Sequence, residues 1–166
     1  MKSLKIRPII EKDKTWVSNL LAEWWAGPKV VTRGKIHYAN ELPGFIATQE
    51  GKQVGLITYH TDGKECEITS MNSLAEGKGV GSALLDAVKN ACVAAGCKRL
   101  WLITTNDNTT ALRFWQKRGF RLAAVYPNAI EESRRLKQEI PLTGNDDIPI
   151  RDEIELELIL AQTPNE

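Results

Sequence analysis

The sequence has few of the residues that build metal sites or disulfide frameworks. Its 166 residues include three cysteines, Cys66, Cys92 and Cys97, and two histidines, His37 and His60. The cysteines are odd in number and lack Cys-x-x-Cys spacing, and the histidines lie in different segments, so the pattern supports neither a disulfide scaffold nor a zinc site. We expect no metal, and free thiols in a reducing, cytoplasmic compartment.

Long apolar runs and an excess of one charge are also missing. No stretch reaches the ~18 to 20 apolar residues of a membrane span, so no membrane partner is expected. The 22 lysines and arginines nearly cancel the 21 aspartates and glutamates. This balance argues against nucleic-acid binding through bulk charge.

The length predicts a single domain over residues 1–166, because a chain of this size can bury a full hydrophobic core. Residues 127–153, called the insert below, separate the last two predicted strands. Connections this long in compact domains are usually functional or mobile.

Hydrophobic periodicity predicts an alternation of strands and helices. Residues 4–8 alternate as in a strand, and Asp13 can cap a helix that ends near Gly27–Pro28. Residues 29–43 show a poor pattern, so a loop or a short helix is expected there. Further strands are predicted at 45–48, 53–60, 65–73, 100–103, 120–126 and 154–160, and further helices at 80–95, 111–119 and 128–137.

Alternating glycines stand where a predicted strand runs into a helix, in Gly77-x-Gly79-x-Gly81. Such a turn directs unpaired backbone N–H groups and the positive end of the helix dipole at one place, which suits a phosphate. The same glycines also fit a plain tight turn. Gly81 is followed by Ser82-Ala83, which does not match a P-loop, and the spacing does not match a dinucleotide fingerprint.

A second motif follows the turn in the order that one family requires. Glu76-Gly77-Lys78-Gly79-Val80-Gly81 is followed by Asn108, Ala111, Phe114-Trp115 and Gly119-Phe120. From about residue 68 to 126 the chain resembles the GNAT (Gcn5-related N-acetyltransferase) family. The resemblance is weak before that segment and absent in the insert.

The resemblance implies an α/β (α+β) fold with a mixed, mostly antiparallel central sheet of about seven strands flanked by helices. The fourth and fifth strands, 65–73 and 100–103, would splay apart and hold acetyl-CoA between them. The implied activity is acetyl transfer by direct attack of a primary amine, from a small molecule or a peptide, in a ternary complex. The expected cofactor-binding residues are Met71, Asn72, Ser73, Glu76, Gly77, Lys78, Gly79, Val80, Gly81, Ser82, Asn106, Asn108, Ala111 and Trp115. Asn108 also suits a helix N-cap, and the two roles are compatible.

Proton transfer is expected to involve carboxylates and water. A primary amine is almost wholly protonated near pH 7, so a base must accept its proton, and Glu67 is the leading candidate, with Glu65 as an alternative. A solvated surface charge is an equal explanation for Glu67. Trp115 stands where the family often has a tyrosine acid, and an indole is not a proton source. Tyr126 or water would then protonate the thiolate, or no acid is needed.

The acceptor is less well defined by the sequence. Trp24, Trp25, Arg33, His37 and Tyr38 fall where the family has variable acceptor loops, and 133–137 in the insert form a basic cluster that suits either an anionic acceptor or a solvated helix face. Glu76 departs from the usual Arg or Gln of the motif. The sequence leaves three functions open: an acetyltransferase, a non-catalytic acyl-CoA-binding or regulatory module, and a structural interaction protein. A homodimer is possible.

Overall fold

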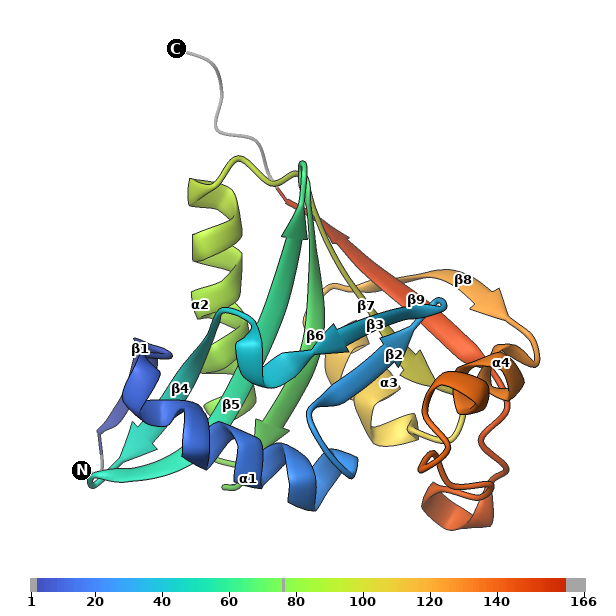
Figure 1. The fold of residues 1–166 in the computed structure, drawn as a ribbon. Coiled ribbons are helices and arrows are strands. Elements are labelled where there is room, and N and C mark those ends of the chain that lie inside the picture. The colour runs from blue at the N-terminus through green and yellow to red at the C-terminus, as the bar shows by residue number, and fades with distance from the viewer. Residues whose placement is uncertain (1–2, 76, 161–166) are drawn as a thin grey trace.

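The alternating apolar segments form one sheet of seven strands in the order β1-β4-β5-β6-β7-β9-β8 (Figure 1). The structure is a computed structural model and describes residues 3–75 and 77–160. Neighbouring strands are antiparallel except β6 and β7, which are parallel. The predicted mixed, mostly antiparallel sheet is therefore confirmed. The strands of this sheet are β1 (Leu4–Pro8), β4 (Gly44–Gln49), β5 (Lys52–Asp62), β6 (Glu65–Ser73), β7 (Arg99–Thr105), β8 (Arg121–Tyr126) and β9 (Glu153–Ile159).

Helices cover both faces of this sheet (Figure 1). They are α1 (Lys14–Trp25), α2 (Val80–Ala94), α3 (Thr109–Lys117) and α4 (Ala129–Leu136). Successive strand residues point to opposite faces. Ile46 and Leu56 accordingly pack in the apolar cluster of α1, whereas the adjacent Ala47 and Ile57 pack in the cluster of α2. Each buried Leu or Ile contributes about 1.5–3 kcal/mol relative to exposure, so the two clusters hold the sheet between the helices.

The strands β6 and β7 separate part-way along their length, as the fold prediction required. Their pairing ends at Ile68 and Leu102. Immediately after this point β6 bulges, because Ile68 pairs with Tyr59 of β5 while Ser70 pairs with Thr58, leaving Thr69 between them. Thr58 Oγ1 lies 2.7 Å from Thr69 Oγ1 and 2.5 Å from Ser70 Oγ, which holds the bulge in place. The bulge therefore marks where the gap between β6 and β7 begins.

Residues 29–43 form a hairpin, so the expectation of a loop or a short helix was wrong. Strands β2 (Lys29–Thr32) and β3 (Lys35–Tyr38) pair antiparallel as a separate two-stranded sheet. The β-branched run Val30-Val31-Thr32 favours a strand. Arg33 and Gly34 join the strands with φ of 50° and 74°, the positive values that tight hairpin turns require.

Asp13 does not cap α1 with its side chain, contrary to the prediction. Its carboxylate accepts hydrogen bonds from Ile10 N at 2.8 Å and from both terminal nitrogens of Arg7 at 2.7 and 2.8 Å. These bonds fix the turn that precedes the helix. The hydrogen bonds from Arg7 hold the pKa of Asp13 below its usual range.

Two basic side chains hold the insert in place, one through bonds within the insert and the other through bonds to the rest of the chain. Arg134 donates to the carbonyls of Ile140 at 3.3 Å and Ile150 at 2.7 Å, which closes the insert on itself. Lys137 Nζ donates to the carbonyls of Trp25 and Lys29, which attaches α4 to the segment after α1. The insert therefore lies beside the β2–β3 hairpin (Figure 1).

Across the described residues, no helix has both the length and the apolar composition that crossing a membrane would require.

Candidate active site

The glycine turn leads directly into α2, as predicted. Gly77 and Gly79 have φ of 73° and 74°, and Gly79 is the left-handed residue that precedes the first residue of the helix, Val80. A side chain at either glycine would strain the backbone, because L-residues rarely adopt positive φ. Glu76 lies outside the described residues. The start of α2 thus has the geometry of an anion site, with its first backbone N–H groups unpaired within the helix.

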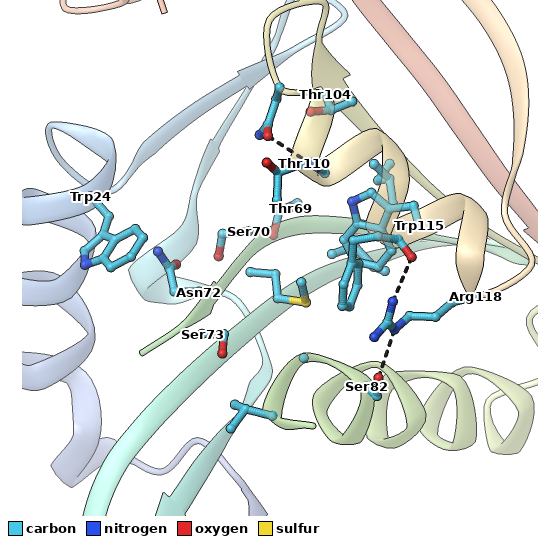
Figure 2. Close-up of a pocket in the computed structure, with 18 of the residues that line it drawn as sticks. Trp24, Thr69, Ser70, Asn72, Ser73, Ser82, Thr104, Thr110, Trp115 and Arg118 are labelled. Atoms are coloured by element: carbon cyan, nitrogen blue, oxygen red, sulfur yellow. Dashed lines mark hydrogen bonds between the residues drawn. The ribbon is translucent and has the colours of Figure 1, made fainter. Parts of the chain in front are cut away.

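A groove of about 550 Å³ runs from this turn into the gap between β6 and β7. Figure 2 shows Thr69, Ser70, Asn72 and Ser73 of β6 on one side and Trp115 on the other. The groove brings together most of the residues predicted to bind the cofactor: Met71, Asn72, Ser73, Gly77, Gly79, Val80, Gly81, Ser82, Asn108, Ala111 and Trp115.

Two of these residues also have structural roles. Asn108 Oδ1 accepts a hydrogen bond from Ala111 N at 3.1 Å, so the prediction that it caps α3 is confirmed. Trp115 is 5% exposed, and its ring meets those of Phe114 and Phe120 edge-on at 4.8 and 5.1 Å. Its main contribution is therefore to the packing of α3 against the sheet.

Arg118 is a groove residue that the sequence did not single out. Its Nε donates to Ser82 Oγ at 2.9 Å, its Nη1 donates to the carbonyl of Phe114, and its guanidinium lies 3.6 Å from the centre of the Phe114 ring (Figure 2). These contacts hold a permanent positive charge beside the first turn of α2. The sequence feature that could have indicated this role is the position of Arg118 at the end of α3, one residue before Gly119. From there its side chain can reach back to Ser82.

Asn72 has an unpaired donor in the groove. Trp25 Nε1 donates to Asn72 Oδ1 at 3.0 Å, and an indole nitrogen can only donate, so the amide orientation of Asn72 is fixed. Its Nδ2 is then buried without a partner among the described groups, although the residue is only 2% exposed. Buried donors nearly always have a partner, so Asn72 Nδ2 is an exception among the described groups.

A second cavity, of about 440 Å³, meets the groove; we call it the insert cavity. Trp24, Trp25, Thr69, Thr104 and Asn108 are among the residues that line both. The remaining walls come from the end of α1, from β2, from the start of β9 and from the insert. The predicted acceptor residues Trp24 and Trp25 therefore stand at the junction of the two cavities.

Glu67 is buried beneath the insert cavity but is not among its lining residues. Its Oε2 accepts a 2.7 Å hydrogen bond from Thr32 Oγ1, and Thr32 does line the cavity. His37 Nε2 lies 3.2 Å from Glu67 Oε1 without the alignment of a hydrogen bond. Burial raises the pKa of Glu67 and lowers that of His37, so burial favours the neutral form of both groups.

Glu153, which the sequence did not single out, does line the insert cavity. It is 2% exposed and begins β9. Its Oε2 accepts from Arg33 N at 3.1 Å, and its Oε1 lies 3.8 Å from Arg33 Nη1. Burial raises the pKa of this carboxyl as well. No sequence motif marks the residue, because its position depends on the insert and on the hairpin that contains Arg33.

Four other residues predicted to bind the cofactor or transfer protons do not line either cavity. The ring of Tyr126 is covered by the guanidinium of Arg33 at 3.4 Å, and its hydroxyl donates to Glu155 at 3.1 Å. Asn106 accepts from the backbone of the insert, Lys78 is exposed, and Glu65 is 3.7 Å from Arg99. Neither cavity includes these side chains among its lining residues.

The cysteines Cys66, Cys92 and Cys97 are buried free thiols packed between α2 and the sheet. Within residues 3–75 and 77–160, His, Cys, Asp and Glu side chains form no group of three or more that could hold a metal ion.

Comparison with known proteins identifies the family. A model of the acetyltransferase (GNAT) family matches residues 11–120. The chain belongs to this family. The GNAT resemblance seen in the motifs is thereby confirmed, and it extends beyond the segment that carried it.

Alignments with relatives and with solved structures cover nearly the whole of this GNAT family member. Uncharacterized protein YdhI from Bacillus subtilis (strain 168) is 47% identical over 150 residues, which cover 90% of this chain and 94% of that one. The fold is similar to the ribosomal-protein-S18-alanine N-acetyltransferase from Escherichia coli, with a TM-score of 0.70 and 15% identity over 99% and 98% of the two chains. It is also similar to a GNAT family acetyltransferase from Elizabethkingia anophelis with acetyl-CoA bound, with a TM-score of 0.67 and 19% identity over 95% and 98%.

Proposed function

We propose that the protein is an acetyl-CoA-dependent N-acetyltransferase that moves an acetyl group to the primary amine of a small molecule or peptide. The observation that carries the proposal is the meeting of two cavities at the bulge of β6. One is a groove that starts at the glycine turn of α2, and the other contains a buried carboxylate. A phosphate-bearing thioester and an amine can therefore approach each other from different directions in a ternary complex.

The groove has groups that fit acetyl-CoA, which supplies the activated acetyl group as a thioester. The turn Gly77 to Gly81 offers backbone N–H groups to the pyrophosphate, and Arg118 adds a positive charge next to them. Backbone groups of 71–73 lie along the unpaired edge of β6, where they can bond the pantetheine amides. A solved GNAT family acetyltransferase of similar fold has acetyl-CoA bound, which supports acetyl-CoA as the cofactor.

The bulge of β6 has a second role in the proposal. A backbone N–H at Thr69 or Ser70 is released from strand pairing with β7 because that pairing ends at Ile68. Such a donor can stabilise the charge that builds on the thioester oxygen during attack. No acidic side chain is required for the departing thiolate, because a thiol with a pKa of about 8.5 is already a fair leaving group. Water is the proposed source of its proton, because Tyr126, the other candidate of the sequence, lines neither cavity and its hydroxyl donates to Glu155.

Glu67, the base that the sequence predicts, remains the proposed base, and its contacts provide a path for the proton of the amine. Thr32 lines the insert cavity and its Oγ1 donates to Glu67 Oε2, so a proton from the amine can pass through one hydroxyl group to the carboxylate. The raised pKa of Glu67 makes it a stronger base than an exposed glutamate. A Glu67→Gln variant should lower kcat/KM and flatten its pH dependence. Full activity between about pH 6 and 9 would contradict the assignment.

The function is tested by measuring the release of free coenzyme A thiol. The purified chain is incubated with acetyl-CoA and a panel of amines, amino acids and peptides, and its thermal stability is measured with acetyl-CoA alone. Thiol release with an amine supports the acetyltransferase. Stabilisation without thiol release favours the acyl-CoA-binding or regulatory module, and the absence of stabilisation favours a structural interaction protein.

A further inference from the structure

Glu153 is the buried carboxylate in direct contact with the insert cavity. One of its oxygens is committed, because Oε2 accepts from Arg33 N. The other, Oε1, is 3.8 Å from Arg33 Nη1, which is beyond hydrogen-bond range. Oε1 can therefore accept a hydrogen bond from a ligand in the cavity. Glu67, by contrast, reaches the cavity only through Thr32.

The position of Glu153 in the sheet brings it close to the proposed thioester. Glu153 pairs with Thr105 of β7, and Thr104 and Thr105 line the same cavity. Thr104 also lines the groove, on the side of the gap opposite the bulge. A group held by Glu153 thus lies near the junction of the two cavities.

The walls of the insert cavity define the chemistry of its occupant. Its cationic lining side chain is Lys137, whose Nζ already donates to two backbone carbonyls, whereas Glu23, Glu139 and Glu153 contribute carboxylates. The cavity therefore favours a positive group and disfavours a carboxylate. Most of the remaining lining is apolar or aromatic: Ala22, Trp24, Trp25, Ala26, Val30, Val31, Ile103, Ile130, Ile140, Pro141 and Ile150.

We propose that Glu153 binds the ammonium group of the acceptor and receives its proton, and that the acceptor is a small primary amine with an apolar body and no carboxylate. This inference rests on the proposed acetyl transfer. One ammonium proton passes to Glu153 Oε1, and the freed nitrogen lone pair forms the bond to the acetyl carbon. The C–S bond breaks, its electron pair stays on sulfur, and the second proton of the attacking nitrogen passes through the Thr32 hydroxyl to Glu67.

Burial and neighbouring charges together determine the pKa of Glu153. Its carboxylate faces Arg33 from the hairpin, Glu132 from α4, and Glu67 from β6. Burial is the largest influence on its pKa and raises it, which brings the carboxyl closer to the range where it can take a proton from an ammonium. Arg33 acts in the opposite direction and lowers the pKa of Glu153.

Glu153→Gln is the variant that tests the inference, with Glu157→Gln as its matched control. Gln keeps the shape of the side chain and an oxygen that can accept from Arg33 N, so the fold should be retained. Glu157 lies on the same strand and face, but its carboxylate bonds Arg99 at 2.6 Å and does not line the cavity. Acetyl-CoA affinity by calorimetry and kcat/KM by thiol release are measured for all three proteins.

The amine panel contains matched pairs that differ by one carboxylate: 2-phenylethylamine with phenylalanine, and isopentylamine with leucine, together with a short peptide. We expect each amine to exceed its carboxylated partner at least tenfold in kcat/KM. Glu153→Gln should lose about 100-fold in kcat/KM and the acidic limb of the pH profile, while acetyl-CoA binding stays unchanged. Glu157→Gln should stay within threefold of the parent protein.

The outcomes separate the inference from the function on which it rests. No thiol release from the parent protein with any amine, amino acid or peptide overturns the acetyltransferase itself. Turnover that survives Glu153→Gln within threefold overturns the role of Glu153 and leaves the acetyltransferase intact. A preference for amino acids or the peptide overturns the acceptor class. If Glu153→Gln does not fold, Ile140→Trp fills the same cavity, and unchanged turnover of 2-phenylethylamine then counts against the inference.

Discussion

Trp25 Nε1 donates a 3.0 Å hydrogen bond to Asn72 Oδ1, which joins the end of α1 to β6 beyond the point where β6 leaves β7. The two residues are far apart in the sequence; Asn72 lines the groove, and Trp25 lines both the groove and the insert cavity. This bond fixes the orientation of the Asn72 amide.

Removing the indole donor should destabilise the protein. Trp25→Phe keeps an aromatic ring but leaves both polar atoms of the buried Asn72 amide unpaired. Leaving a buried polar group unsatisfied costs about 1–3 kcal/mol, so we expect a loss of that size in the free energy of unfolding, measured by urea denaturation. Trp24→Phe is the control, because Trp24 is 52% exposed. Equal stabilities of the two variants would show that the bond contributes nothing.

Acetyl-CoA binding should depend on the backbone of the glycine turn more than on its side chains. Gly79→Val strains a residue with φ of 74° and covers the amides at the start of α2, so we expect at least tenfold weaker binding by calorimetry, against less than threefold for Glu76→Ala. Gly96→Val is a matched control, since Gly96 has φ of 80° and equally open space at the other end of α2. If Gly96→Val weakens binding as much as Gly79→Val, the effect is one of stability and not of the site.

Arg118 should contribute to cofactor affinity through its charge. Charge-assisted hydrogen bonds contribute about 1.5–3 kcal/mol, so Arg118→Ala should weaken acetyl-CoA binding roughly 10- to 100-fold and reduce its dependence on salt. Arg113→Ala removes the same charge from an exposed position on α3 that does not line the groove. Equal affinities for the two variants would place Arg118 outside the binding site.

Glu67 should make the protein less stable as the pH rises. Burial raises the pKa of Glu67 in the folded state, so the folded protein favours the protonated carboxyl. The resulting contribution to the free energy of unfolding is complete below the unfolded pKa of about 4.3. It is lost as the pH rises through the pKa of the folded state. Glu67→Gln imitates the protonated form. Its Tm should therefore match that of the parent protein near pH 4 and exceed it near pH 8. A variant that is less stable than the parent near pH 8 would reverse the sign of this effect.

Periodicity and motif order predicted the central sheet, the helices and most of the groove. They succeeded because α2 and β7 have patterns that depend on local sequence alone, as in the apolar run Leu100 to Ile103. The β2–β3 hairpin was missed because its turn, Arg33-Gly34, has a bulky residue at positive φ, where turn signals usually show Asn or Asp. Glu153 was missed for a different reason. It becomes a site residue only through contacts between β9, the hairpin and the insert, which are distant in sequence.

The place of β9 in the sheet has a consequence for how the protein folds. β9 follows β8 along the chain but lies between β7 and β8, so β8 has no partner until β9 has been added. The glycine turn, α2 and β6 come before β9 in the sequence and can assemble without it. The carboxylate of Glu153 takes its place only when β9, the strand that completes the sheet, is added. During synthesis the chain should therefore gain the ability to hold a coenzyme before it gains the ability to hold an amine.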